Sequence, residues 1–237
     1  MARFLVLHSP LVGPRTVSPF AEALQRLGHG AAAPHLGSAV SAGGLSPSIL
    51  RTIVGQSVSS MPQHAPLIVL AHSGAGAYLP ILSTHLAVAG QVLIDAVAPP
   101  PAGRFTPSAD FRSELDPLVE PDRRLPPWPQ WWGEDVMAEL VPDPELRAAI
   151  GSECPRLPIS FYDTVIEVPA NWARPWVGYL RLSERYEPEA QVAARRGWPV
   201  CRRVGNHLDI ATRPEDVALD LCELVQPVLE SWAGPTQ

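Results

Sequence analysis

Lysine is absent from this chain of 237 residues, and all 18 of its basic residues are arginine. The absence excludes a Walker-type phosphate-binding lysine, a Schiff-base lysine and a serine–lysine catalytic dyad. No more than two arginines are adjacent, and the net charge of −6 is spread along the chain, so we expect no nucleic-acid partner. With abundant alanine, proline and glycine, the arginine bias indicates a GC-rich, bacterial genome.

Cysteine is scarce as well, and the three that occur are far apart in the sequence. Cys154, Cys201 and Cys222 form neither a C-x-x-C pair nor a metal-ligand spacing with histidine. We therefore expect reduced thiols rather than disulfides, with no metal site and no cofactor.

Long hydrophobic runs are also missing, because no apolar stretch approaches the roughly 18 residues that a membrane span requires. The first residues lead directly into an apolar strand and lack the layout of a signal peptide. The sequence thus predicts a cytoplasmic protein without a membrane partner.

What the chain does contain is a 46% hydrophobic composition arranged as alternating strands and helices. Short continuous apolar runs are typical of strands that are covered on both faces, and the segments between them have helical spacing. The alternation predicts an α/β fold with a doubly wound, mostly parallel sheet. The expected strands are 3–8, 31–33, 67–71, 92–95, 177–182 and 200–204, and the expected helices are 18–27, 46–60, 74–86, 188–196 and 214–232.

Residues 97–175 interrupt this alternation with many prolines and a cluster of tryptophans at Trp128, Trp131 and Trp132. A helix is expected within the segment, near residues 143–150. We interpret the segment as an inserted cap, with a core made of residues 1–96 and 176–237.

The stretch LIVLAHSGAGAYLP, residues 67–80, places Ser73 where a buried strand ends and a helical pattern begins. Small residues, Ala71 and Ala75, stand two positions before and after this serine. A nucleophile elbow needs this arrangement, because its turn is too tight for larger neighbours. The simpler interpretation is that Ser73 caps the following helix.

A second motif, Gly205-Asn206-His207, lies after the last expected strand and before the final helix. The two motifs together resemble the α/β-hydrolase superfamily, and the resemblance covers nearly the whole chain. It implies that Ser73 is the nucleophile and His207 the catalytic base, in the chain order known for this fold. Otherwise His207 is a surface loop histidine.

The resemblance leaves two places for the acid that would orient His207. The usual position, after the penultimate strand, nominates Glu184, with Glu187 as a weaker candidate. The position after the strand that follows the elbow nominates Asp95, which ends an apolar strand where an unpaired carboxylate would be costly. We rank Asp95 slightly ahead, although it could instead cap the following turn.

The oxyanion hole departs from the family pattern. In this superfamily one donor is the N–H after the nucleophile, here Gly74, and the other comes from the loop after the first central strand, here Ser9, Pro10 and Leu11. Pro10 has no N–H, so either the Leu11 N–H or the Ser9 hydroxyl would have to substitute. His72 is a further candidate for contact with the oxyanion or substrate, and the His8-Ser9 pair is weakly similar to the esterase and hydroxynitrile-lyase branch.

These residues predict a serine hydrolase for a carboxylic ester or thioester of an apolar or aromatic small molecule, with Trp128, Trp131 and Trp132 over the site. Two alternatives remain open. One is a lyase, decarboxylase or cyclase of secondary metabolism that uses Ser73 and His207 for proton transfer. The other is a member of the fold that binds a small molecule without catalysis. A homodimer is compatible with the sequence.

Overall fold

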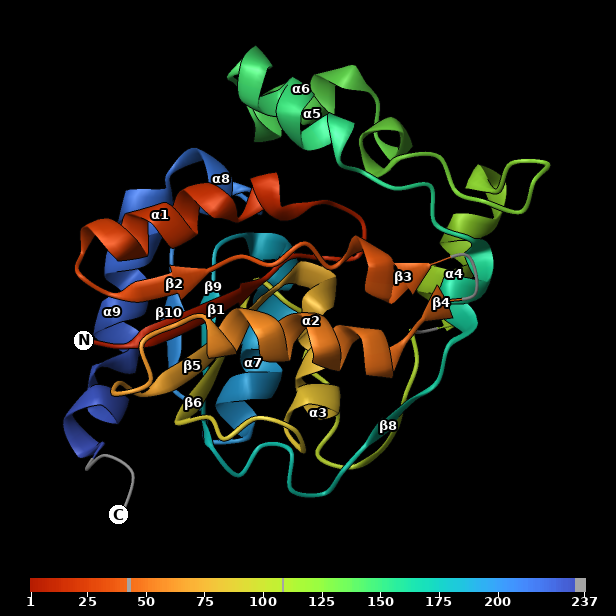
Figure 1. Ribbon diagram of the computed structural model, residues 1–237. Coiled ribbons are helices and arrows are strands. Elements are labelled where there is room, and N and C mark those ends of the chain that lie inside the picture. Colours follow the sequence, from red (N-terminus) through yellow and green to blue (C-terminus); the bar gives the residue numbers. More distant parts are fainter. Residues whose placement is uncertain (42–43, 108, 233–237) are drawn as a thin grey trace.

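A computed structural model describes residues 1–41, 44–107 and 109–232, and its centre is a six-stranded sheet (Figure 1). All neighbouring strands in this sheet are parallel, in the order β10-β9-β6-β5-β1-β2. The predicted doubly wound parallel sheet is therefore confirmed. Its strands are β1 (Arg3–Leu7), β2 (Gly30–Ala32), β5 (Leu67–His72), β6 (Gly90–Ile94), β9 (Trp176–Arg181) and β10 (Val200–Arg202).

Helices cover both faces of the sheet, as a parallel sheet requires. One face packs against α1 (Ser18–Arg26) and α9 (Pro214–Ser231), whose apolar residues form a core with Phe4, Ile68 and Leu180. The other face packs against α2 (Pro47–Ser59), α3 (Leu79–Leu82) and α7 (Glu187–Arg195). The apolar strands are thus buried on both sides, which explains why they are continuous runs without alternation.

The segment after the elbow differs from the expected helix over 74–86. Residues Ser73–Tyr78 form a 3₁₀ helix, and only Leu79–Leu82 are α-helical. The backbone here is held close to the next loop, because a side chain at Gly76 would overlap the Val97 carbonyl. Glycines also disfavour a regular helix, so the first turns wind more tightly than the pattern indicates.

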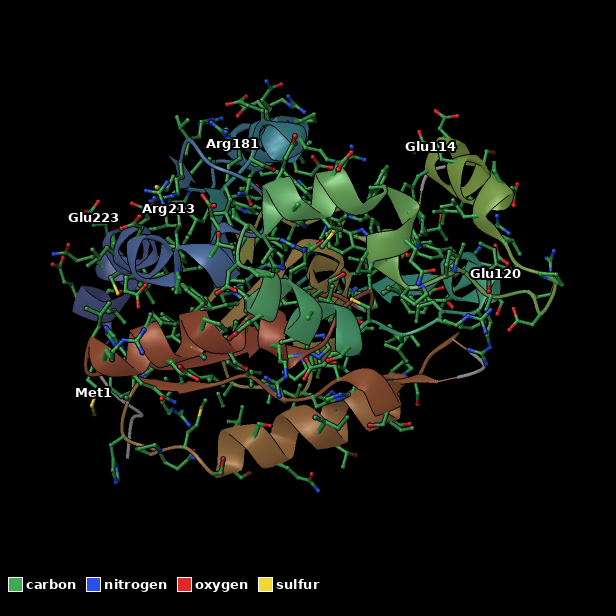
Figure 2. The ribbon with its side chains drawn as sticks, turned by 90° about the horizontal axis from the view of Figure 1, so that it is seen from above. Met1, Glu114, Glu120, Arg181, Arg213 and Glu223 are labelled. Atoms are coloured by element: carbon green, nitrogen blue, oxygen red, sulfur yellow. The ribbon has the colours of Figure 1, made fainter. Side chains whose placement is uncertain are left out.

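Residues 97–175 leave the sheet after β6 and return before β9. Their two ends are joined by an antiparallel pair, β7 (Gly103–Phe105) with β8 (Ile166–Val168). Between them lie α4 (Ala109–Leu115), α5 (Glu134–Leu140) and α6 (Pro144–Ser152), the last of which is capped by Asp143. Figure 1 shows α5 and α6 of this segment in green above the sheet, and Figure 2, seen from that side, shows Glu114 of α4 at the outer edge.

Two small hydrophobic clusters hold this segment in place. In one, Met137 and Ile150 of the segment pack with Val12 and Leu208 from loops at the edge of the sheet. The other lies within the segment and is made by Leu115, Leu125, Ile159 and Tyr162. Residues 97–175 therefore have an apolar interior of their own and also cover the loops around the candidate site. The remaining short elements are β3 (Val40–Ser41), β4 (Gly44–Leu45) and α8 (Asp209–Thr212).

Candidate active site

The switch in strand order falls between β1 and β5, because the chain continues from β1 to β2 on one side and from β5 to β6 on the other. Loops at the carboxyl ends of these strands diverge and leave a crevice, which is the usual ligand site of such sheets. Ser9, Pro10 and Leu11 follow β1, and Ser73 follows β5. The sheet topology therefore brings these two sequence motifs together.

Ser73 has a left-handed backbone, with φ of 58° directly after β5. This conformation costs a non-glycine residue roughly 1–2 kcal/mol, so the surrounding contacts must hold it. The Ser73 carbonyl accepts a hydrogen bond from the Val97 N–H at 3.2 Å. An N-cap would have extended backbone instead, and His72, not Ser73, occupies that position here. The geometry is that of a strained turn which presents the serine side chain.

His207 lies in the loop after β10, and its Nδ1 is 2.9 Å from Oδ2 of Asp95. Because a carboxylate only accepts hydrogen bonds, Nδ1 carries the proton, which leaves Nε2 available as an acceptor. Asp95 itself follows β6 with φ of 43° and is completely buried. Two strained residues, Ser73 and Asp95, thus stand at the ends of adjacent strands.

Four hydrogen bonds saturate the carboxylate of Asp95. Its Oδ1 accepts from the N–H groups of Leu182 at 2.7 Å and Ser183 at 3.0 Å, and its Oδ2 accepts from the Ser183 hydroxyl at 2.5 Å and from His207. Burial alone would raise the pKa of Asp95, but the hydrogen bond and charge of His207 and the hydrogen bonds of Ser183 lower it below its ordinary value. The carboxylate is therefore ionised at neutral pH.

The other acidic candidates lie elsewhere. The Glu184 carboxylate is 80% exposed and pairs with Arg181 at 2.9 Å. Glu187 also pairs with Arg181 and with Arg202. The structure thus places Asp95, and neither glutamate, against His207.

The imidazole of His207 lies between two other rings. Tyr186 stacks on it at 4.9 Å between ring centroids with an interplanar angle of 8°, and His72 stacks at 4.6 Å and 26°. Nε2 of His72 donates to the His207 carbonyl at 3.0 Å, and burial lowers the pKa of His72 to about 3. His72 is therefore neutral and supports His207, and because it also lines a cavity at Ser73, its contact with the oxyanion or substrate stays a prediction.

The Ser73 hydroxyl contacts Tyr186, since its Oγ is 3.4 Å from the phenol oxygen. Burial raises the pKa of Tyr186 to about 12, so the phenol stays protonated and can donate. Ser73 and His207, both among the described residues, make no direct hydrogen bond with each other. In unliganded sites such bonds are often long and shorten only when substrate binds.

The loop after β1 contacts the elbow closely. A side chain at Gly74 would lie 3.0 Å from Cδ of Pro10 and 3.2 Å from Oγ of Ser9. The Leu11 N–H points to the Ser9 hydroxyl over a long 3.4 Å. His8 fixes this loop from below, because its Nδ1 donates to the Ser9 carbonyl while its Nε2 accepts from the Leu36 N–H. The close approach of Ser9 and Pro10 to Gly74 explains why a glycine follows Ser73.

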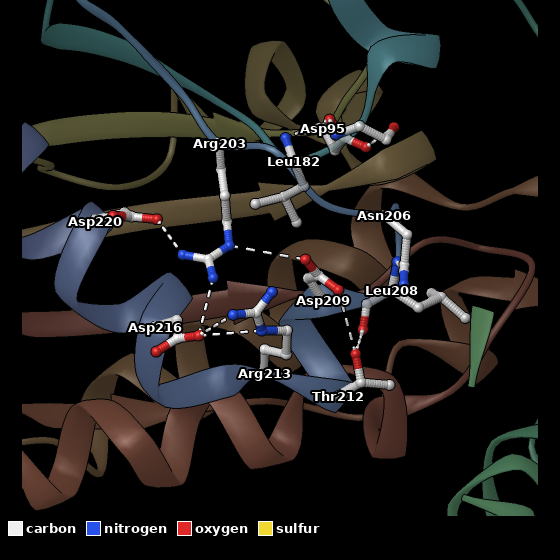
Figure 3. A network of polar contacts seen from close by, with 11 residues as sticks. Asp95, Leu182, Arg203, Asn206, Leu208, Asp209, Thr212, Arg213, Asp216 and Asp220 are labelled. Carbon is white, nitrogen blue, oxygen red and sulfur yellow. Dashed lines mark hydrogen bonds and ion pairs between the residues drawn. The ribbon is translucent and has the colours of Figure 1, made fainter. Parts of the chain in front are cut away.

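The loop that carries His207 is anchored by a network of charges (Figure 3). Arg203 pairs with Asp209 at 3.7 Å, with Asp216 at 2.9 Å and with Asp220 at 2.8 Å. Within the loop, the Asn206 side chain accepts from the Leu208 N–H at 2.8 Å. A side chain at Gly205 would overlap the Asp209 carboxylate, so a larger residue here would force that carboxylate to move.

Two cavities open at Ser73. One has a volume of about 370 Å³ and is lined by Trp128, Trp131 and Trp132, together with His207. The other has a volume of about 620 Å³ and extends past Gly74 and Pro10. The three tryptophans named from the sequence therefore line a cavity at the serine, whereas Trp172 is fully buried in the core. Among the described residues, no cluster of three or more histidine, cysteine or acidic side chains could hold a metal ion.

Solved structures provide the comparison that decides the fold. An extracellular α/β-hydrolase from a Paenibacillus species matches with a TM-score of 0.72 and 16% identity, over 94% of this chain and 99% of its own. The chain has the α/β-hydrolase fold. A pyrethroid hydrolase from Sphingobium faniae matches with a TM-score of 0.68 and 15% identity, over 95% and 97% of the two chains. A variant of tomato methylketone synthase I matches with a TM-score of 0.67 and 12% identity, over 96% and 98%.

Sequence comparisons add nothing to this assignment, since no family model and no curated protein matches the chain. The α/β-hydrolase fold accounts for the parallel sheet, the left-handed turn at Ser73 and the position of His207 after the last strand. In the part of the chain that the structure describes, no helix has the length and apolar character needed to cross a membrane.

Tyr186 and Ser183 are the neighbours of the candidate triad that the sequence analysis missed. Both follow β9, in the loop where Glu184 drew attention as an acid. Only the hydrogen bonds of Asp95 show that Ser183 supports a carboxylate from the adjacent strand. No sequence pattern signals the ring stacking of Tyr186 on His207.

Proposed function

We propose that this α/β-hydrolase-fold protein is a serine hydrolase that cleaves a carboxylic ester or thioester of an apolar small molecule. The observation that carries the proposal is the pair formed by Asp95 and His207, 2.9 Å apart beside a serine in a left-handed turn. A base that is oriented by a buried carboxylate, next to a nucleophile, is the arrangement that acyl transfer requires. The solved structures named as hydrolases and esterases support the same reaction class.

In the proposed reaction, Nε2 of His207 takes the Ser73 proton while Oγ attacks the ester carbonyl. The resulting imidazolium is stabilised by ionised Asp95 through Nδ1. His207 then gives the proton to the leaving alcohol or thiol as the carbonyl re-forms, which leaves an acyl-serine. Water, activated by His207, attacks this acyl group, releases the acid and restores Ser73.

The tetrahedral oxyanion needs hydrogen-bond donors, and we assign the N–H groups of Gly74 and Leu11. Pro10 cannot supply one, but the Leu11 N–H has only a 3.4 Å contact with Ser9 and can turn to a stronger acceptor. Residues 97–175 would serve as the cap and residues 1–96 and 176–237 as the core, with no cofactor in the reaction.

A substitution at Ser73 tests the proposal directly. We expect Ser73→Ala to lower kcat/KM on the ester substrates that the wild type cleaves by about 10⁴-fold or more, because the nucleophile is lost. Ser59→Ala, at an exposed position on α2, should keep the wild-type rate. Hydrolysis that proceeds equally well in Ser73→Ala would contradict the proposal.

A second candidate keeps the fold without an acyl-enzyme. Its support is that the Ser73 hydroxyl contacts Tyr186 rather than His207, and that Pro10 removes one usual oxyanion donor. Ser73, Tyr186 and His207 would then move protons in a lyase, decarboxylation or cyclisation reaction. Turnover of an apolar metabolite that is reduced but retained in Ser73→Ala, and lost in His207→Ala, would favour this candidate, because proton transfer without an acyl-enzyme does not require the serine as a nucleophile.

A further inference from the structure

Ser73 stands at the junction of the two cavities rather than at the end of one. The smaller, of about 370 Å³, and the larger, of about 620 Å³, are each within the size range of small-molecule sites. The residues that line both surround the candidate nucleophile: Ser9, Leu11, Ser73, Phe111, Arg185 and Tyr186. A molecule bound through Ser73 therefore has room on two sides.

The two cavities are lined by different residues of the candidate active site. His207 lines the smaller cavity and is not part of the larger one. Gly74 and Pro10 line the larger cavity and are not part of the smaller one. The base thus lies toward the smaller cavity and Gly74, one of the two proposed oxyanion donors, toward the larger, while the other donor, Leu11, lines both.

This asymmetry determines how an ester must lie. The group that leaves needs a proton from His207, so its oxygen or sulfur must face that histidine. The carbonyl carbon stays bonded to Ser73, and its oxygen points to the Gly74 N–H, so the acyl chain extends away from His207. We infer that the smaller cavity binds the leaving alcohol or thiol and the larger cavity binds the acyl group. This inference rests on the proposed function.

The lining of each cavity identifies the class of group that it would bind. Around the leaving group lie three tryptophans with Val136 and Leu140, which fit an aromatic or branched apolar alcohol. Around the acyl group lie Phe105, Phe161, Ile166 and Val192, with Thr106, Thr164 and Glu189 as polar neighbours. The substrate is thus an ester with apolar groups on both sides, the larger on the acyl side.

Two valines offer a matched pair of substitutions that test this orientation. Val136 lies on α5 and lines only the smaller cavity, whereas Val192 lies on α7 and lines only the larger one. The probes are two isomeric esters, methyl nonanoate with its chain on the acyl side and octyl acetate with its chain on the alcohol side. For each protein, the ratio of kcat/KM for methyl nonanoate to that for octyl acetate is measured.

We expect Val192→Trp to lower this ratio at least tenfold relative to the wild type, because it fills the acyl cavity. Val136→Trp should raise the ratio at least tenfold, because it fills the leaving-group cavity. Leu219→Trp, on the exposed surface of α9, controls for the added indole and should keep the wild-type ratio. Circular dichroism and Tm establish that each variant is folded.

The outcomes separate this inference from the proposed function. Ser73-dependent hydrolysis with shifts in the reverse directions, or with no shift in either variant, would overturn the orientation and leave the hydrolase proposal standing. If no ester is cleaved in a Ser73-dependent manner, the proposed function fails, and the orientation fails with it.

Discussion

At the scale of the residue, the candidate site depends on where one carboxylate lies. Asp95 is buried and receives hydrogen bonds from Leu182, Ser183 and His207, while Glu184 is exposed beside Arg181. A charge in such a position is tolerated because every lone pair is satisfied. Asp95 is therefore both a structural anchor between β6 and β9 and the orienting partner of His207.

Substitutions of the two candidate acids, Asp95 and Glu184, can be compared directly. Asp95→Asn should lower kcat by about 10⁴-fold, because an amide cannot hold the tautomer that leaves Nε2 as the base. It should also lower the free energy of unfolding, since the amide N–H₂ would face donors from Ser183. Glu184→Gln, the matched change at an exposed site, should alter kcat less than twofold. A large loss in Glu184→Gln with an active Asp95→Asn protein would reverse the assignment.

The sequence carried much of this residue-scale information, but not all of it. The small residues around Ser73 and the position of His207 were sufficient to nominate both, since each follows from local chain geometry. The choice between Asp95 and Glu184 stayed open because it depends on which carboxylate reaches His207 in the folded chain, and only the tertiary hydrogen bonds show that. The contact of Tyr186 with His207 is tertiary as well, so no local pattern could show it.

At the scale of the element, the loop between β10 and α8 positions His207. Arg203 ties its start to Asp216 and Asp220 of α9, and to Asp209 of α8. The Arg203 side chain is only 14% exposed. Salt therefore screens its ion pairs with the three carboxylates less than it screens an ordinary surface pair. The loop is therefore held at both ends, and this anchoring fixes the position of His207.

A substitution at Gly205 tests whether this anchoring of the loop between β10 and α8 positions His207. Gly205→Ala would force the Asp209 carboxylate away from Arg203, because the added methyl group would overlap it. We expect kcat to fall severalfold and the free energy of unfolding to fall by about 1–2 kcal/mol. Gly151→Ala, in α6 where nothing lies within 4 Å of the added atom, is the matched control and should be neutral or stabilising. Equal effects of the two alanines on activity would argue against a positioning role for the loop.

The strands and helices also show how far the sequence pattern predicts the secondary structure. The six strands of the central sheet were located to within two residues, because most buried parallel strands are continuous apolar runs, whereas the short β3, β4, β7 and β8 were not predicted. The helix expected over 74–86 ends at Leu82 and is 3₁₀ rather than α-helical up to Tyr78, since Gly74 and Gly76 are held in close contact with neighbouring loops. Close packing of this turn against the neighbouring loops overrides the local preference.

At the scale of the whole molecule, two buried neutral histidines link folding to pH. Burial lowers the pKa of His8 to about 4 and that of His72 to about 3, against roughly 6.5 in an unfolded chain. Between these values the unfolded chain binds protons that the folded protein does not. Stability is therefore fully present above about pH 6.5 and decreases as the pH falls toward 4.

We expect Tm to decrease between pH 7 and pH 5, before most carboxylates titrate. His72→Gln removes one of the buried imidazoles and should make Tm depend less steeply on pH over this range. His85→Gln, at an exposed position, should retain the wild-type dependence. The same slope in all three proteins would show that the buried histidines do not govern acid stability.

Labelling by a fluorophosphonate is the most direct test of whether His207 and Asp95 activate Ser73 as a nucleophile. We expect one covalent adduct, located at Ser73 by mass spectrometry of the digested protein. Labelling should be at least a hundredfold slower in folded His207→Ala, because the base is gone. Folded wild-type protein that remains unlabelled, or labelling that is as fast in His207→Ala, would contradict an activated serine.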